Sequence, residues 1–316
     1  MRARLVPPVL AVALLASCGS DGPQRAEPRA SAPPSSSTAL GAGAVTPGTT
    51  VPLPTKLLVV VLENHSQAQA WEQMPYLREL GTAYGRTSSY RALTHPSLPN
   101  YLALAGGSTF GVHDDRYPAS HPLRGPSVFG QALDHGRTAK TYAEGMTFTC
   151  RATSAGRYAV KHNPWAYFAD AAERTACRRY DVPLGTTSAG ALRDDTLRGT
   201  LPNVGMVIPD GCSDAHDCSL ATADRWLRTW GALWTSSPDF RTGRLAVVVT
   251  FDEDDRSEGN AVLTVVAHRR LHRVVVATSQ THLELSAWLS RAAGAPPLRS
   301  AVGHRTLGRA FTLSTS

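Results

Sequence analysis

The sequence predicts an α/β fold in which helices flank a mostly parallel central sheet, and two observations support this. Residues 57–62 and 245–251 are continuous runs of aliphatic and β-branched side chains, a pattern typical of strands buried on both faces of a parallel sheet. Elsewhere, shorter apolar segments alternate with stretches whose apolar residues recur at helical spacing. The chain shows no internal repeat.

One shorter strand is recognised as a β-branched run that ends at a chain-breaking residue. Residues 204–208 form such a run, and Pro209 stops it because proline cannot donate to a sheet ladder. In chain order, the predicted strands are 57–62, 141–143, 204–208, 245–251, 261–267 and 274–277.

Helices are predicted where apolar residues fall on adjacent turns. In three of the segments these positions are Trp71, Met74, Leu77, Leu80 and Tyr84; then Trp226, Leu227, Trp230 and Leu233; then Leu283, Leu285, Trp288 and Leu289. The predicted helices are 70–84, 97–105, 221–234 and 281–292.

The pattern of the N-terminal residues is typical of an export segment. Arg2 and Arg4 precede an apolar stretch, 5–16, which is too short to span a hydrocarbon core of roughly 30 Å. The stretch ends in Leu-Ala-Ser-Cys18, which resembles the lipobox of bacterial lipoproteins and implies a lipidated Cys18. The alternative is an ordinary cleaved signal peptide. Either way we expect export, to the outer face of the cell membrane or into the medium.

The expected domain organisation follows from composition. Residues 1–17 are predicted as a lipoprotein signal peptide. Residues 18–54 are rich in Pro, Ser, Ala and Gly and are predicted to be a disordered tether, because they cannot bury enough apolar surface to fold. Residues 55–316 are predicted as one folded domain. The net charge of +7 is compatible with anionic substrates or surfaces, but there is no basic run and we expect no nucleic-acid partner.

Four cysteines remain when Cys18 is set aside, and an even number in an exported chain suggests two disulfides. Three pairings are possible. We favour Cys150 with Cys177 and Cys212 with Cys218. A zinc site built from all four is disfavoured because no Cys-x-x-Cys pair occurs.

Polar residues follow directly after the two strongest strands. Glu63 and Asn64 follow 57–62, whereas Asp252 and Glu253 follow 245–251. Carboxyl ends of parallel strands meet at one edge of the sheet, which is where open α/β sheets bind their ligands. Carboxylate and amide oxygens suit a hard cation. We therefore predict a joint site for a divalent metal cation of unknown identity, although solvated loop residues would show a similar pattern.

A third segment, residues 94–101, contains a candidate nucleophile. Two prolines fix the backbone around Ser97, and Asn100 lies one helical turn away. A serine can attack when a base or a metal activates it, and Asn100 could donate to a phosphoryl oxygen in the transition state. The alternative is a turn with a helix-capping serine.

Two further segments contain candidate acid/base groups. His162 lies in Lys-His-Asn-Pro-Trp, while Asp214 and His216 lie between Cys212 and Cys218, in a loop that a disulfide would pin. Six further histidines have no such setting and are interpreted as surface or structural residues: His113, His121, His135, His268, His272 and His304. The role of His282 is left open.

Taken together and in this order, the motifs carry a family resemblance. They are Val-Leu-Glu63-Asn64-His65, His-Pro-Ser97-Leu-Pro-Asn100-Tyr, His162-Asn-Pro, Asp214-x-His216-Asp217 and Phe-Asp252-Glu253-Asp-Asp. The set resembles the bacterial phosphoesterase family of secreted acid phosphatases and phosphatidylcholine-type phospholipases C, within the alkaline phosphatase superfamily. It is most similar to the actinobacterial secreted acid phosphatases.

The resemblance implies an alkaline-phosphatase-like fold and assigns roles to these residues. Glu63, Asn64, Asp252 and Glu253 match the family's metal ligands. Ser97 matches the nucleophile and Asn100 the phosphate-binding Asn. The matches of His162, Asp214 and His216 imply that they orient phosphate, protonate the leaving oxygen or hold a second cation.

The implied activity is acid phosphatase: hydrolysis of phosphate monoesters, either phosphorylated small molecules or phosphoinositide-type substrates. We expect a monomer attached to the membrane through Cys18. The chain lacks the long insertions of the phospholipases C, which makes a phosphodiesterase or phospholipase C the second choice. A non-enzymatic solute-binding lipoprotein is the alternative from another class, but the two similar lobes expected of such a protein are not seen.

Overall fold

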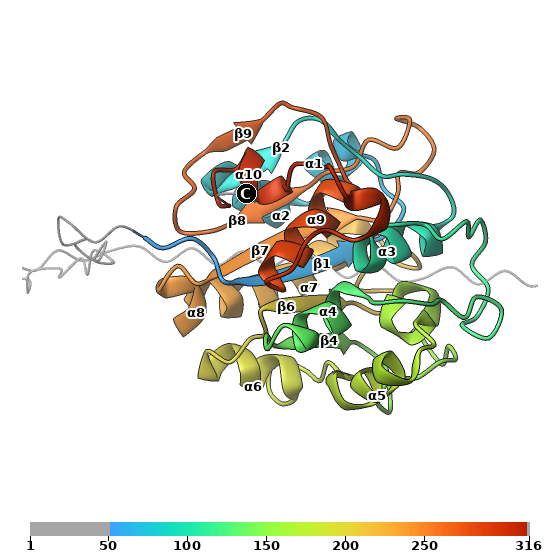
Figure 1. The fold of residues 1–316 in the computed structure, drawn as a ribbon. Coiled ribbons are helices and arrows are strands. Elements are labelled where there is room, and N and C mark those ends of the chain that lie inside the picture. The colour runs from blue at the N-terminus through green and yellow to red at the C-terminus, as the bar shows by residue number, and fades with distance from the viewer. Residues whose placement is uncertain (1–50, 315–316) are drawn as a thin grey trace, which may run out of the picture. The chain divides into compact units, whose positions relative to one another are not determined.

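An eight-stranded sheet crosses the centre of the computed structural model, which describes residues 51–314 (Figure 1). The strands lie in the order β5 (Asp181–Pro183), β4 (Ala139–Ala143), β6 (Val204–Ile208), β1 (Lys56–Leu62), β7 (Leu245–Phe251), β8 (Val265–Ala267), β2 (Gly85–Thr87) and β9 (Val274–Val276). β8 runs antiparallel to both neighbours, and the remaining pairs are parallel. The predicted fold class, a mostly parallel sheet flanked by helices, is confirmed.

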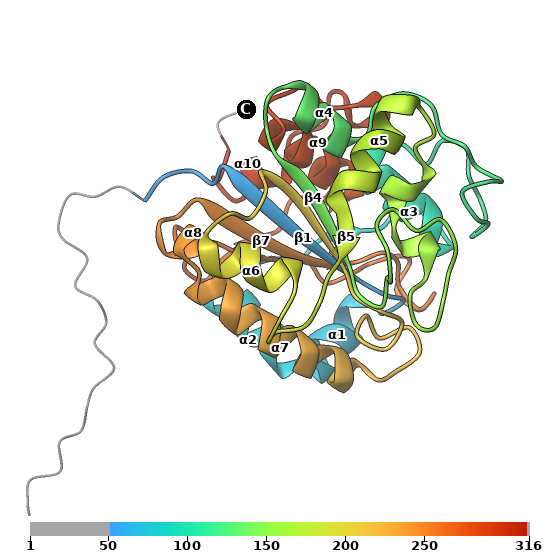
Figure 2. The ribbon, with the colours of Figure 1, turned by 90° about the horizontal axis from the view of Figure 1, so that it is seen from below.

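Helices cover both faces of this sheet. Figure 2 shows α1, α2, α6, α7 and α8 on one face, and α3, α4, α5, α9 and α10 on the other. Their bounds are α1 (Gln67–Gln73), α2 (Pro75–Ala83), α3 (Ser97–Gly106), α4 (Val128–Asp134), α5 (Ala171–Tyr180), α6 (Ala191–Arg198), α7 (Leu220–Ser236), α8 (Pro238–Arg241), α9 (His282–Ala292) and α10 (Leu307–Ala310). Three 3-10 turns are η1 (Val160–His162), η2 (Pro164–Tyr167) and η3 (Arg299–Ala301), and β10 (Gln280–Thr281) pairs with β3 (Tyr90–Arg91).

The central strands β1 and β7 position the site. Every residue of β7 is buried, as is every residue of β1 after Lys56, because helices cover both faces of the sheet. The two strands pair in parallel from Lys56↔Leu245 to Leu62↔Phe251, so they end at the same level. The backbone N–H of Asp252 continues the ladder by donating to the carbonyl of Leu62 at 2.9 Å. The residues that follow the two strands are therefore neighbours.

Two predicted elements need correction. The single helix predicted over 70–84 is two helices, α1 and α2, because Met74 precedes Pro75 and a residue before proline is sterically kept out of the helical conformation. The strand predicted over 261–267 is limited to Val265–Ala267, where β8 meets β7 and β2.

The predicted signal peptide, 1–17, and the predicted tether up to residue 50 lie outside the described residues. Within residues 51–314, no helix is both long and apolar enough to cross a membrane.

Candidate active site

The predicted metal ligands lie together where β1 and β7 end. Glu63 and Asp252 are fully buried, and the backbone N–H of Asn64 donates to Asp252 Oδ1 at 3.0 Å. Asn64 adopts φ 53°, a left-handed conformation that asparagine tolerates better than most residues. Behind them, His282 Nε2 lies 2.7 Å from the carbonyl oxygen of Asp252, and its Nδ1 lies 3.0 Å from Tyr90 Oη. Burial lowers the pKa of His282 to about 4, so this histidine holds the backbone as a neutral group.

Glu63 is the centre of the site. Its Oε2 accepts a hydrogen bond from Ser97 Oγ at 3.0 Å, and its Oε1 accepts one from Tyr101 Oη at 2.5 Å. Ser97 is the first residue of α3, and Tyr101 is four residues further on, so both side chains lie on one face of that helix. His162 Nε2 lies 3.3 Å from the same Oε1.

His162 lies between two carboxylates. Its Nδ1 is 3.2 Å from Asp214 Oδ2, and its ring stacks on Tyr101 with centroids 5.2 Å apart. Burial disfavours the charged imidazole, but Glu63 and Asp214 outweigh it and raise the pKa of His162 to about 10. Burial would likewise raise the pKa of Glu63, but the charge of His162 prevails and lowers it to about 2. The two groups form a buried ion pair.

The loop after β6 holds Asp214 and His216. Its ends are joined by the disulfide Cys212–Cys218, as predicted. The N–H of His216 donates to Asp214 Oδ1 at 2.8 Å, and its Nδ1 lies 2.7 Å from Asp217 Oδ1. The His216 ring is 5.9 Å from that of His162, but its side chain is 35% exposed. His216 therefore forms the solvent-facing side of the site.

Asn100 supports the loop before Ser97. Its Oδ1 accepts from the N–H groups of Leu93 and Thr94, and its Nδ2 donates to the Thr94 carbonyl at 2.8 Å and approaches Glu253 Oε2 at 3.4 Å. The side chain is fully buried. The side-chain amide of Asn100 is therefore already hydrogen-bonded to the backbone of Leu93 and Thr94.

His95 and Tyr101 were not assigned from the sequence, although both stand in the segment 94–101. His95 Nδ1 lies 3.2 Å from Glu253 Oε1, and its Nε2 lies 3.1 Å from Asp254 Oδ1. The i+4 spacing of Ser97 and Tyr101 was the available signal for the tyrosine. Nothing in the local pattern indicated that His95 would reach the late acidic segment.

The donor set fits a hard cation. Glu63, Asp214, Asp252 and Glu253 are all buried, and Asp252 Oδ2 has no hydrogen-bond partner within residues 51–314. Burial and the neighbouring charges of Glu63 and Glu253 raise the pKa of Asp252 well above its usual value. Burial also raises the pKa of Glu253 to about 7, although His95 opposes this. A divalent cation would neutralise this excess of carboxylates.

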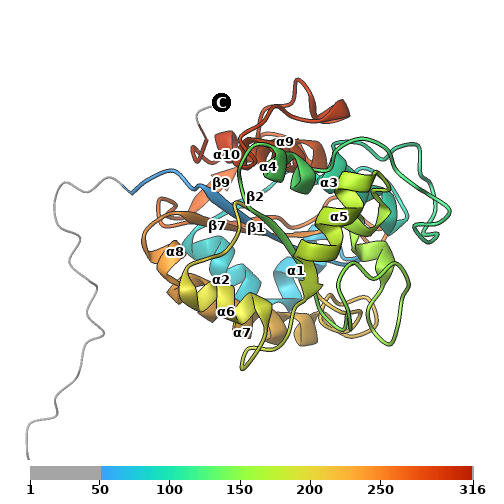
Figure 3. The ribbon, with the colours of Figure 1, turned by 60° about the horizontal axis from the view of Figure 1, so that its bottom comes forward.

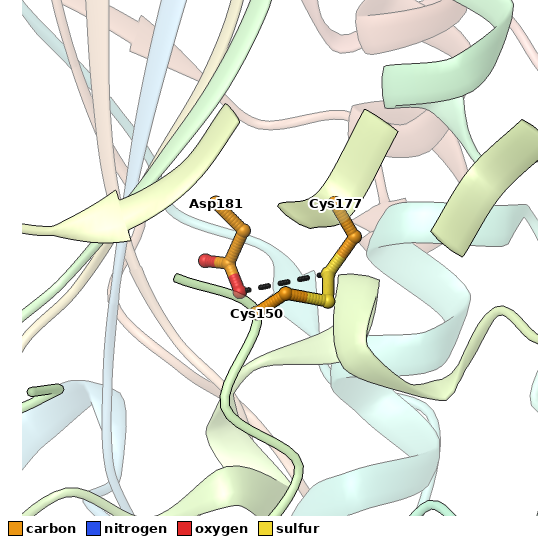
Figure 4. A group of neighbouring side chains, drawn as sticks. All are labelled: Cys150, Cys177 and Asp181. Carbon is orange, nitrogen blue, oxygen red and sulfur yellow. Dashed lines mark hydrogen bonds between the residues drawn. A yellow bond between two sulfur atoms is a disulfide. The ribbon is translucent and has the colours of Figure 1, made fainter. Parts of the chain in front are cut away.

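Two groupings of three metal-binding side chains occur within residues 51–314. Ligand atoms of Glu63, His162 and Asp214 lie within 4.8 Å of one another, so they could hold a second cation that shares Glu63. Cys150, Cys177 and Asp181 are equally close, but Figure 4 shows the two sulfurs joined in the predicted disulfide, which leaves no thiolate for a metal.

The sheet with helices on both faces is similar in fold to a solved structure from the alkaline phosphatase superfamily. A superfamily protein from Vibrio parahaemolyticus superposes with a TM-score of 0.51 at 11% identity, covering 77% of this chain and 68% of that one. The lipoteichoic acid synthase LtaP from Listeria monocytogenes gives 0.51 at 9% identity, covering 79% and 76%. At these identities the likeness defines the fold alone.

The family follows from the sequence comparisons. Residues 66–257 match the model of the Phosphoesterase family, and the chain belongs to that family. It is 32% identical to the phosphatidylinositol-3-phosphatase of Mycobacterium tuberculosis, over 66% of this chain and 67% of that protein. It is 30% identical to an acid phosphatase of Aspergillus fumigatus, over 66% of this chain and 46% of that one. The chain spans about half the length of the fungal relatives it matches. The predicted family is confirmed, and we class the protein with the phosphoric ester hydrolases.

Proposed function

We propose that this protein is an exported, metal-dependent acid phosphatase that hydrolyses phosphate monoesters with Ser97 as its nucleophile. The observation that carries the proposal is the buried hydrogen bond from Ser97 Oγ to Glu63 Oε2, which puts a hydroxyl directly beside the proposed cation ligands. The relatives named acid phosphatase and phosphatidylinositol-3-phosphatase support a phosphorylated substrate, either a small molecule or a phosphoinositide. The two disulfides support export.

Glu63, Asn64, Asp252 and Glu253 would hold the divalent cation. When bound, it would supply Lewis-acid chemistry: it would offset the substrate's negative charge and favour the ionised form of a nearby hydroxyl. Asn100 acts as a positioning residue in this proposal, because its amide holds the backbone that precedes Ser97.

The chain's own groups account for the proton and bond changes. Ser97 Oγ attacks phosphorus in line and passes its proton to Glu63 Oε2, which accepts its hydrogen bond, so a serine O–P bond forms as the bond to the leaving oxygen breaks. His216 donates a proton to that oxygen, because it faces solvent at the rim where a leaving group departs. Water then attacks the phosphoserine and gives a proton to His216, while Glu63 returns a proton to Ser97 Oγ, so phosphate and Ser97 are released. His162, buried between Glu63 and Asp214, keeps these carboxylates in place and orients the phosphate.

The experiment is hydrolysis of p-nitrophenyl phosphate and of bis(p-nitrophenyl) phosphate by the purified chain, before chelation, after chelation and after return of single divalent cations. We expect monoester hydrolysis that chelation abolishes and one or more cations restore. A preference for the diester would replace the proposal by a phosphodiesterase, and full activity after exhaustive chelation would refute metal dependence.

A further inference from the structure

The segment that follows β4 at the site's edge has an unusual charge pattern. Residues 145–161 contain Arg151, Arg157 and Lys161 but no Asp or Glu. The same segment carries Phe148, whose side chain is 55% exposed. Figure 3 shows this segment among the loops at the end of the sheet toward which β1 runs.

Phe148 lies in a loop that is ordered by several contacts. Arg151 Nη1 donates to Thr147 Oγ1 at 2.6 Å, and its guanidinium lies over the Phe148 ring at 4.9 Å. Tyr158 Oη donates to the Arg151 carbonyl at 2.8 Å, and a disulfide joins Cys150 to Cys177. The ring is therefore held outward by a braced loop.

A second aromatic ring protrudes from the adjoining loop. Tyr117 is 55% exposed, and the preceding Arg116 has a 73% exposed side chain whose Nε lies 3.5 Å from Asp114 Oδ2. This loop is fastened to the chain just after the basic segment, since Tyr167 Oη donates to the Arg116 carbonyl at 3.0 Å. The large hydrophobic side chains exposed within residues 51–314 include two aromatic rings, Tyr117 and Phe148, and both lie in these loops.

Both loops border the proposed nucleophile and acid. The Arg157 carbonyl accepts from the N–H of Gly211, at the start of the loop that carries His216. Asp115 Oδ1 accepts from the N–H of Leu98, next to Ser97. A surface that rested on these loops would therefore face the site.

We propose that Tyr117 and Phe148, with Arg151 and Arg157, form a docking surface for an anionic lipid bilayer, called here the basic aromatic rim. Aromatic rings favour the membrane–water interface, and each nearby cation adds about 1 kcal/mol of attraction to an anionic leaflet. A soluble acidic partner would account for the arginines but not for two exposed rings. The proposal rests on the proposed function and extends it: the substrate class becomes a phosphorylated lipid headgroup presented in a membrane.

The first test measures binding without catalysis. The purified full chain, with Cys18→Ala in every sample to exclude an attached lipid, is sedimented with vesicles of phosphatidylcholine alone or with phosphatidylserine. We expect salt-sensitive binding to the anionic vesicles and a loss of about tenfold in the variant Tyr117→Ser with Phe148→Ser. Val302→Ser, which removes another hydrophobic side chain with 64% exposure, is the matched control and should bind like the parent. Equal binding by the double variant and the parent would refute the proposed docking surface. The same holds if the parent binds anionic and neutral vesicles equally.

The second test separates the rim from the chemistry. Hydrolysis of a phosphatidylinositol 3-phosphate with short, soluble chains is compared with that of the long-chain lipid in anionic vesicles. We expect the double variant to keep the soluble reaction within about twofold and to lose about tenfold on vesicles. Equal losses on both substrates would refute the docking role of the basic aromatic rim. No hydrolysis of any monoester by the parent would instead refute the proposed function, while the binding result would still decide whether the rim docks on lipid.

Discussion

Ser97 Oγ and Glu63 Oε2 are 3.0 Å apart, although 34 residues separate them along the chain. Glu63 is positioned by the end of β1, whereas Ser97 is positioned by the first turn of α3, which packs against η1 and α9. Tyr101 and His162 contact the other oxygen of the same carboxylate, Glu63 Oε1. The glutamate thus joins the proposed nucleophile, a tyrosine and a histidine in one buried group.

Replacing Ser97 by alanine should abolish turnover while the fold is kept. The change removes one hydroxyl, and the carboxylate that it leaves still contacts Tyr101 and His162. Monoester hydrolysis and thermal melting would be measured beside Ser290→Ala, a control at a buried serine in α9. Turnover of the Ser97 variant within about tenfold of the parent, a barrier change of about 1.4 kcal/mol, would exclude Ser97 as the nucleophile.

The variant Asp252→Asn should bind its cation more weakly and lose activity, because one charged ligand becomes neutral. Its stability without metal should rise or stay level, since the parent buries this carboxylate beside Glu63 and Glu253. Metal content after dialysis and activity against added cation are the measurements. The exposed Asp255→Asn serves as the control. Unchanged metal content in the Asp252 variant would remove this residue from the ligand set.

The double variant Cys212→Ser with Cys218→Ser should lose more turnover than stability. Its disulfide spans a sequence separation of only 6, so the stability lost should be at the low end of the usual 2–4 kcal/mol, about 2 kcal/mol. The loop carries Asp214 and His216, and a displacement of about 1 Å at such a site can cost roughly a hundredfold in rate. Melting and monoester hydrolysis of the same samples give both quantities. Full activity in the double variant would show that the disulfide does not position His216.

The free energy of unfolding should fall as the pH rises from 4 to 6, because the unfolded chain releases the Asp181 proton in this range. Burial raises the pKa of this carboxyl from 3.8 to about 6, although Thr141 and Asn163 donate to it. The folded state therefore holds a proton that the unfolded chain releases, and stability fully present below pH 4 is lost as the pH passes 6. The loss should be on the order of 3 kcal/mol.

The check for Asp181 is urea unfolding at intervals from pH 4 to 7. Asp181→Asn should flatten the dependence, because the amide can still accept from Asn163 and carries no charge. The exposed Asp134→Asn should keep the slope of the parent. An unchanged slope in the Asp181 variant would assign the dependence to other groups.

Much of the framework was predictable from local pattern. The two aliphatic runs predicted β1 and β7, and parallel pairing placed Glu63 and Asp252 at one edge without further information. The family followed from the order of the motifs and is confirmed by the matching family model. The disulfide pairing was also correct, since four cysteines other than Cys18 allow only three pairings.

Features set by near neighbours along the chain could be predicted from local pattern: which segments are buried strands, where they end, and which polar side chains follow. Long-range packing places His162 between Glu63 and Asp214 and brings His95 to Glu253 and Asp254. The contacts of His162 and His95 join loops that follow different strands. Their partners are chosen by the packing that buries the loops and by the need to satisfy each buried charge, and neither is written in local spacing.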